Sequence, residues 1–173
     1  MTIYLIGMMG SGKSYLGTKL ADALDKPFAD LDERIEKREG KTIAAIFKEH
    51  GQPYFRKTET ETLRLTQNEN ALIATGGGAP CHDGNMNWMN RYGLTIYLQV
   101  HVDTLMERLQ SNGTERPMLG DLQGPELKNY LTNLLAERQP FYEEAGIIYD
   151  TTNQDEDKVI NDLVPQILER ANL

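Results

Sequence analysis

The chain has 173 residues, of which 39% are hydrophobic and 25% charged, and its net charge is −8. This length favours one domain with its own core, covering residues 1–173, in an ordinary globular protein. The acidic balance argues against nucleic acid as a general partner, and a single cysteine excludes an internal disulfide. With no recognisable leader and no apolar run long enough to span a membrane, we expect a cytoplasmic protein, and we expect a monomer.

Five short apolar runs predict buried β-strands, and the segments between them carry apolar residues at helical spacing. This alternation predicts an α/β fold with a parallel sheet covered by helices on both faces. A short helix starting near Ile43 is expected to close at Gly51, and Pro165 is expected to kink or break the C-terminal helix. The predicted strands are residues 2–7, 27–32, 71–78, 94–100 and 146–151.

The first predicted strand leads into the sequence GMMGSGKS at residues 7–14. This stretch matches G-x-x-x-x-G-K-[ST], the phosphate-binding P-loop, between a strand and a helix as the motif requires. Its glycines let backbone N–H groups surround an anion, and the next helix adds its N-terminal N–H groups. Lys13 is expected to reach the β- and γ-phosphates, and Ser14 to ligate Mg²⁺. The predicted ATP contacts here are Gly10, Ser11, Gly12, Lys13, Ser14 and Tyr15.

Two acids, Asp30 and Asp32, follow the second predicted strand, where they project from one face of an extended chain. At the carboxyl end of a strand beside the P-loop strand, they could hold a magnesium-bound water and accept a proton from a substrate hydroxyl. The alternative is an ordinary helix start, because acids are favoured in a first turn.

Three further features carry basic or glycine residues that suit a substrate site. Arg56 and Glu59 are three residues apart on one helical face, as a simple ion pair or as a fork held for a substrate carboxylate. The glycines of residues 76–78 suit a backbone pressed against a ligand. Arg138, in an apolar helical segment before Pro140, is either capped by an acid or turned into a cleft.

The segment from residue 112 to 125 has three glycines, two prolines and one arginine, Arg116, without helical or strand periodicity. A loop of this length is a functional element such as a lid, or a solvated excursion. No N-K-x-D motif of a guanine-specific switch is present, and the chain is short for a motor or transporter ATPase. A small-molecule kinase is therefore favoured, because the chain is small and has an arginine in this loop.

Taken together, the motifs resemble those of the shikimate kinase family. The resemblance runs from about residue 3 to 152 and rests on the P-loop, D-x-D, F-R-x-x-E, G-G-G, R-P and E-R-x-x-x-Y. It implies a three-layer P-loop kinase fold of the nucleoside-monophosphate-kinase group, with a five-stranded parallel sheet in the order 2-3-1-4-5. It also implies a substrate-binding region at about residues 32–60 and a mobile lid at about 112–124.

The resemblance further implies transfer of the ATP γ-phosphoryl group to the 3-hydroxyl of shikimate, a step toward chorismate and the aromatic amino acids. Mg²⁺ would be the cofactor, and ATP and shikimate the small-molecule partners. The implied roles are catalysis for Lys13, Asp32 and Arg116, shikimate binding for Asp32, Arg56, Glu59, Gly76, Gly77, Gly78 and Arg138, nucleotide binding for Arg108, Arg116 and Asn153, and Mg²⁺ binding for Ser14 and, through water, Asp30.

The segment after the fifth strand, residues 150–159, is acidic where relatives often carry arginine or proline, so adenine contacts by Asn153 and Gln154 are the least defined expectation. The single arginine in the predicted lid argues against a nucleotide acceptor. Two alternatives stay open from the sequence. These are a kinase for another polyhydroxy acid, such as gluconate, and a non-catalytic nucleotide-binding module.

Overall fold

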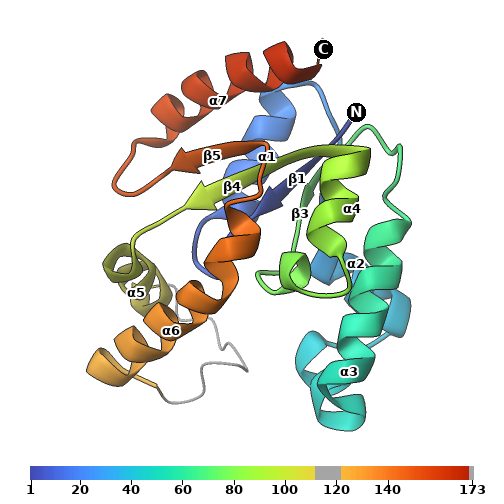
Figure 1. Cartoon of the computed structure of the whole chain (residues 1–173), viewed down its shortest axis with the longest axis vertical. Helices are drawn as coiled ribbons and strands as arrows, with labels where there is room; N and C mark the ends of the chain where they lie inside the picture. Colours follow the sequence, from blue (N-terminus) through green and yellow to red (C-terminus); the bar gives the residue numbers. More distant parts are fainter. Residues whose placement is uncertain (112–121, 172–173) are drawn as a thin grey trace.

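The computed structural model describes residues 1–111 and 122–171. Within them, five parallel strands form one sheet in the order β2-β3-β1-β4-β5, which confirms the predicted topology (Figure 1). The predicted lid arginine Arg116 lies outside the described residues. The strands are β1 (Thr2–Ile6), β2 (Phe28–Asp30), β3 (Leu72–Ala74), β4 (Gly93–Gln99) and β5 (Ile147–Asp150).

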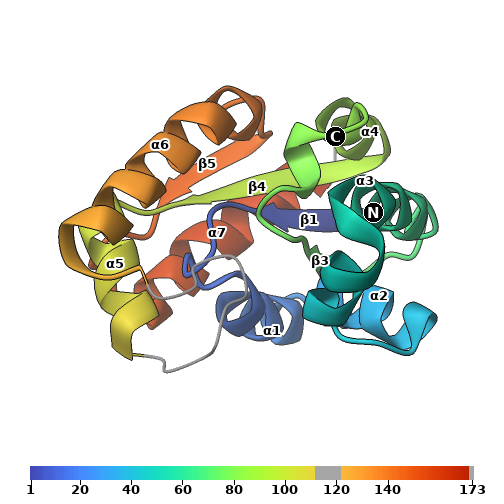
Figure 2. The same ribbon diagram turned by 90° about the horizontal axis from the view of Figure 1, so that it is seen from below.

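Helices cover both faces of the sheet and complete three layers (Figure 2). α1 and α7 lie together on one face, and α4 and α6 lie on the other (Figures 1 and 2). The helices are α1 (Lys13–Ala23), α2 (Leu31–Glu39), α3 (Ile43–Arg64), the 3₁₀ turn η1 (Ala79–Cys81), α4 (Asn85–Tyr92), α5 (Val102–Ser111), α6 (Gly124–Tyr142) and α7 (Glu156–Ala171).

Residues of β1 alternate between two hydrophobic clusters because successive side chains of a strand point to opposite faces. Ile3 and Leu5 pack with the apolar residues of α1 and α7, whereas Tyr4 and Ile6 pack with those of α3, α4 and α6. All four are fully buried. Both faces of a parallel sheet are therefore core, as expected for a nearly continuous apolar run.

Several element boundaries differ from the predictions. The third strand ends at Ala74, well before the predicted end at residue 78, so the glycines lie in the loop beyond it. Gly51 has φ 77° and ψ 177°, which interrupts α3 where a helix end was predicted, but the helix resumes at once and continues to Arg64. α7 continues through Pro165 to Ala171, so the helix is not broken there.

The carboxyl ends of all five strands meet at one edge of the sheet, because the strands are parallel. The P-loop follows β1, Asp30 ends β2, the glycine loop follows β3, and Thr151 follows β5. In open α/β sheets, ligands bind in the crevice outside these ends. The fold thus brings motifs that are far apart in the sequence to one place.

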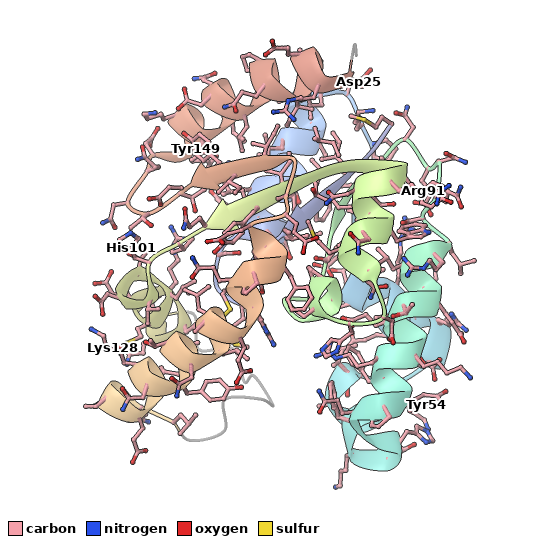
Figure 3. The ribbon with its side chains drawn as sticks, in the orientation of Figure 1. Asp25, Tyr54, Arg91, His101, Lys128 and Tyr149 are labelled. Carbon is pink, nitrogen blue, oxygen red and sulfur yellow. The ribbon has the colours of Figure 1, made fainter. Side chains whose placement is uncertain are left out.

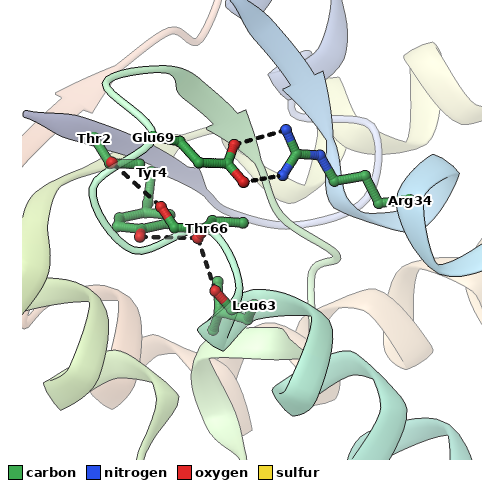
Figure 4. A network of polar contacts seen from close by, with 6 residues as sticks. All are labelled: Thr2, Tyr4, Arg34, Leu63, Thr66 and Glu69. Carbon is green, nitrogen blue, oxygen red and sulfur yellow. Dashed lines mark hydrogen bonds and ion pairs between the residues drawn. The ribbon is translucent and has the colours of Figure 1, made fainter. Parts of the chain in front are cut away.

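The C-terminal end of α3 is joined to β1 by a network of buried hydroxyl groups (Figure 4). Thr66 Oγ1 donates to the Leu63 carbonyl at 2.7 Å, so Tyr4 Oη, 3.0 Å away, must donate to Thr66. The Thr2 hydroxyl also reaches the Thr66 carbonyl at 3.4 Å. These bonds fix the C-terminal end of α3 against the sheet, and α3 also carries two of the predicted substrate residues.

The edge strand β5 is held to α7 by a side-chain contact. Tyr149 of β5 lies beneath α7 (Figure 3), and its hydroxyl donates to Asp162 Oδ2 at 2.6 Å. Lys158, four residues before Asp162 in the same helix, reaches the same carboxylate oxygen at 2.5 Å.

In the portion of the chain that the structure describes, no helix has both the length and the apolarity needed to cross a membrane.

Candidate active site

A cavity of about 840 Å³ lies at the carboxyl edge of the sheet. It is lined by residues of the P-loop, α1, β2, α2, α3, the glycine loop, α5, α6, the loop after β5 and α7. The side chain of Ser11 is buried and Asn153 is exposed, and neither lines this cavity. The predicted site residues that do line it are Gly10, Gly12, Lys13, Ser14, Tyr15, Asp30, Asp32, Arg56, Glu59, Gly76, Gly77, Gly78, Arg108 and Arg138.

The P-loop backbone needs its glycines. Gly7 has φ 143°, and a Cβ atom on it would lie 2.8 Å from the Leu98 carbonyl oxygen. Gly12 has φ 92° and precedes α1 without any side-chain cap on the helix N-terminus. Helix N-termini of this kind bind phosphate oxygens through their backbone N–H groups and the positive end of the helix dipole.

Lys13 lies along the loop that precedes it. Its Nζ donates to the Gly7 carbonyl at 2.9 Å and to the Met8 carbonyl at 2.8 Å. The side chain is only 9% exposed and lines the cavity. The ammonium group is thus held at the mouth of the phosphate loop, where it can neutralise an anion.

Asp30 makes two side-chain hydrogen bonds, and the first of them confirms the helix start that the sequence offered as an alternative. Its Oδ1 accepts from the Asp32 N–H at 2.9 Å, so it is the N-cap of α2. Its Oδ2 accepts from the Ser14 hydroxyl at 2.6 Å. The cap and the P-loop hydroxyl are therefore joined through one carboxylate.

Asp32 lies in the first turn of α2, not on an extended strand as predicted, but its side chain still lines the cavity. Burial, with the neighbouring charge of Asp30, raises its pKa to about 6, and Lys13 acts in the opposite direction. Its Oδ1 is buried without a hydrogen-bond partner among the described residues. A buried carboxylate oxygen without a partner suits a hydrogen bond from a ligand hydroxyl.

Arg56 and Glu59 form a buried ion pair, as their spacing predicts. Arg56 Nη1 donates to Glu59 Oε2 at 2.6 Å, and the two residues are 9% and 1% exposed. Burial raises the pKa of Glu59 to about 7, although Arg56 lowers it. Arg56 Nε and Glu59 Oε1 have no partner in the described part of the chain. The pair is therefore fixed in position, with polar atoms left to bind a ligand.

The three glycines after β3 leave room for the side chains of the site. A Cβ atom on Gly78 would lie 2.5 Å from Arg56 Nη2, and one on Gly77 would lie 2.9 Å from Arg138 Nη1. On Gly76 it would lie 2.9 Å from Glu59 Oε1. The sequence predicted that these glycines accommodate a ligand. The structure gives a further reason for them, because a larger residue at Gly77 or Gly78 would displace an arginine and one at Gly76 would displace Glu59.

Arg138 of α6 faces the cavity and is 7% exposed. Among the described residues, no carboxylate lies within ion-pair distance of it, so the sequence alternative of capping by an acid is wrong. Its Nη1 contacts the Met8 sulfur at 4.0 Å. Arg138 thus adds a second guanidinium on the same side of the cavity as Arg56 (both border the glycine loop).

The far end of the cavity is formed by α5, the loop after β5 and α7. Arg108 Nη1 donates to the carbonyls of Gly10 and Ser11, and its Nη2 to that of Thr151, over 3.3 to 3.4 Å. Gln154 lines the cavity here, whereas Asn153 does not. Of the two predicted adenine contacts, the geometry favours Gln154.

Comparison with known proteins decides the family. The family model described as shikimate kinase matches residues 9–168. A shikimate kinase from Bacteroides thetaiotaomicron is 40% identical over 172 residues, covering 99% of this chain and 98% of that relative. The chain belongs to the shikimate kinase family. The motif resemblance seen in the sequence is therefore confirmed.

Solved shikimate kinases share the whole fold. The crystal structure of the B. thetaiotaomicron enzyme has a TM-score of 0.90 at 39% identity, covering 100% of this chain and 99% of that one. Shikimate kinase from Acinetobacter baumannii, solved in complex with shikimate, has a TM-score of 0.85 at 33% identity, covering 98% and 93%. The predicted kinase fold is thus confirmed for the described residues.

Sequence reasoning did not identify two groups of residues at the site. The apolar side chains of Ile43, Phe47 and Phe55 line the cavity. In the sequence, Ile43 and Phe47 only mark a short helix, and Phe55 is only the first letter of F-R-x-x-E. Tyr142 appeared only as the last letter of E-R-x-x-x-Y. Its hydroxyl donates to the Gly77 carbonyl at 2.6 Å, a contact that no local pattern indicates.

Proposed function

We propose that this protein transfers the γ-phosphoryl group of ATP to the 3-hydroxyl of shikimate. The observation that carries the proposal is one cavity that holds both a P-loop and a buried site with two guanidiniums and a carboxylate. Family membership and the relative solved with shikimate support the substrate. The roles assigned to single residues below are part of this proposal.

Arg56 and Arg138 bind the shikimate carboxylate. Both guanidiniums border the glycine loop, and Glu59 holds Arg56 in one orientation. Planar guanidiniums match a carboxylate with paired hydrogen bonds, which gives orientation as well as charge compensation. The backbone of Gly76–Gly78 lies against the ring of the substrate, and Ile43, Phe47 and Phe55 supply the apolar wall.

Asp32 binds the hydroxyl that attacks the γ-phosphate. Its buried Oδ1 accepts a hydrogen bond from this hydroxyl and orients the hydroxyl oxygen toward the γ-phosphate. Phosphoryl transfer needs positioning and charge neutralisation more than covalent chemistry, and Lys13 supplies positive charge at the P-loop. Arg116, outside the described residues, is proposed to add charge from the lid. Exclusion of water by that lid would limit hydrolysis of ATP.

Ser14 and Asp30 fit a site for Mg²⁺. Their oxygens meet at 2.6 Å beside the P-loop, and hard oxygen ligands suit this ion. Across the described residues, no group of three or more acidic, histidine or cysteine side chains could hold a metal alone. Mg²⁺ commonly uses one or two carboxylates, waters and substrate phosphates. When bound, it would neutralise phosphate charge.

The direct test is an acceptor panel in a coupled assay of ADP release. We expect turnover with shikimate, little with quinate or gluconate, and none above background with AMP. Rapid turnover with gluconate and none with shikimate would overturn the proposal in favour of a sugar-acid kinase. ADP release that is the same with and without every acceptor would instead indicate a nucleotide-binding module.

Arg56→Lys and Arg138→Lys are each expected to raise the KM for shikimate by about tenfold or more, because lysine keeps the charge but loses the planar fork. The KM for ATP should stay within about twofold of the original value, since neither side chain belongs to the P-loop. Steady-state kinetics with each substrate varied in turn measures both effects. If only the KM for ATP changed, the assignment of these arginines to the shikimate subsite would be wrong.

A further inference from the structure

Tyr142, the last residue of α6, is fully buried, yet its hydroxyl reaches the glycine loop of the proposed substrate site. The hydroxyl donates to the Gly77 carbonyl at 2.6 Å and also contacts the Met8 sulfur at 3.8 Å. A hydroxyl buried in a core needs a hydrogen-bond partner, and here that partner is backbone from a distant segment. The bond therefore joins α6 directly to the loop after β3.

The hydrogen bond of Tyr142 also affects where the guanidiniums of Arg56 and Arg138 lie. Tyr142 is four residues after Arg138, so the two side chains leave the same face of α6. The Gly77 backbone, which Tyr142 holds, lies against Arg138, and the next residue, Gly78, lies against Arg56. One hydrogen bond thus sets the separation between α6 and the loop on which both guanidiniums rest.

Met8 closes this arrangement on the P-loop side. Its sulfur lies 4.0 Å from Arg138 Nη1 and 3.8 Å from the Tyr142 hydroxyl. Gly77 also borders the P-loop, because a Cβ atom on it would lie 3.3 Å from the Gly7 carbonyl oxygen. The contacts around Arg138 therefore leave little freedom for its guanidinium to shift if the loop stays in place.

We propose that the Tyr142 hydroxyl is a positioning group that sets the geometry of the Arg56 and Arg138 pair for the substrate carboxylate. This inference rests on the proposed carboxylate-binding role of the two arginines. Tyr142 contacts no substrate in this scheme and acts through Gly77. Its aromatic ring belongs to the core, where it packs on Tyr97 with the ring centres 4.9 Å apart. The ring thus stabilises the fold, and the hydroxyl places the binding groups.

The test compares Tyr142→Phe with Tyr97→Phe. Each variant removes one hydroxyl from the same buried ring pair, but within the described chain the Tyr97 hydroxyl makes no hydrogen bond. We expect Tyr142→Phe to raise the KM for shikimate about tenfold, equivalent to about 1.4 kcal/mol, with the KM for ATP within about twofold. Tyr97→Phe should leave both KM values within about twofold. Tyr142→Phe should melt about 2–4 °C lower than Tyr97→Phe, because it alone loses a buried hydrogen bond, and both variants should unfold cooperatively.

A shikimate analogue with its carboxylate reduced to a hydroxymethyl group separates the two levels of the proposal. If the original protein does not prefer shikimate over this analogue, the carboxylate-binding role itself fails. If it does prefer shikimate, the KM penalty of Tyr142→Phe should disappear with the analogue. An equal penalty with both acceptors, or equal effects of the two tyrosine variants, would overturn the positioning role.

Discussion

Replacing Lys13 with methionine is expected to lower turnover by about a thousandfold, the upper range for loss of one donor aimed at transition-state charge. The ammonium group lies at the P-loop, and negative charge shifts among phosphate oxygens during transfer. Methionine keeps most of the apolar stem but cannot neutralise this charge. Turnover is measured by coupled ADP release at saturating ATP and shikimate.

The same variant should remain folded, so that its loss of turnover can be attributed to catalysis and not to unfolding. Lys13 donates to the carbonyls of Gly7 and Met8, so its loss removes two hydrogen bonds from the loop. Hydrogen bonds to charged groups contribute about 1.5–3 kcal/mol each. Loss of the lysine also removes the cost of burying its charge, and the sheet and helices keep their own contacts. A melting curve should show a modest decrease and a cooperative transition.

Lys37→Met is a matched control for Lys13→Met. Lys37 lies on the exposed side of α2, away from the cavity, and its replacement removes the same charge from the chain. We expect its turnover to stay within about twofold, because an exposed charge is largely screened. If Lys13→Met kept turnover within about tenfold of the original, the P-loop lysine would not have its proposed role.

The parts of the fold that follow from periodicity could be predicted from the sequence. The central strands β1, β3 and β4 are buried on both faces and read as apolar runs. The order of the strands follows from the family resemblance. Element ends were less predictable. The loop conformation of the glycines after Ala74 depends on Arg56 and Arg138, which come from α3 and α6. No local rule connects these three segments.

The charged residues of the candidate site were also visible in the sequence, because short motifs carry them. Their partners were not equally visible. Asp30 proved to be both a helix cap and the acceptor for Ser14, although spacing alone presented a choice between a cap and a metal site. Tyr142 and the apolar wall around Phe47 required the three-dimensional structure. These residues act through contacts between distant segments and have no signature of their own.

Asp32→Asn is expected to lower turnover by about two to three orders of magnitude with ATP binding unchanged. Asparagine keeps the size of the side chain and one acceptor, but it loses the charge and most of the basicity. The carboxylate is proposed to orient the attacking hydroxyl and accept its proton. Steady-state turnover and direct titration with an ATP analogue measure the two quantities separately.

The pKa of Asp32 adds a prediction on pH. Since burial raises this pKa to about 6, kcat/KM for shikimate should fall as the pH drops through about 6, because the protonated acid cannot accept the hydroxyl proton. The folded protein binds this proton more tightly than the unfolded chain does, so ionisation of Asp32 above about pH 6 opposes folding. Asp32→Asn should therefore be at least as stable as the original at pH 8. A melting curve that shows this would exclude unfolding as the cause of its low turnover.

Asp30→Asn is the matched control for Asp32→Asn, because asparagine is as good an N-cap as aspartate and keeps the start of α2. Its loss of charge should act on the proposed Mg²⁺ site, since Asp30 accepts from the Ser14 hydroxyl. We therefore expect a higher Mg²⁺ requirement and recovery of turnover at high Mg²⁺. Asp32→Asn should not recover, because its defect lies at the acceptor hydroxyl. If high Mg²⁺ restored Asp32→Asn but not Asp30→Asn, the roles of the two carboxylates would be the reverse of those proposed.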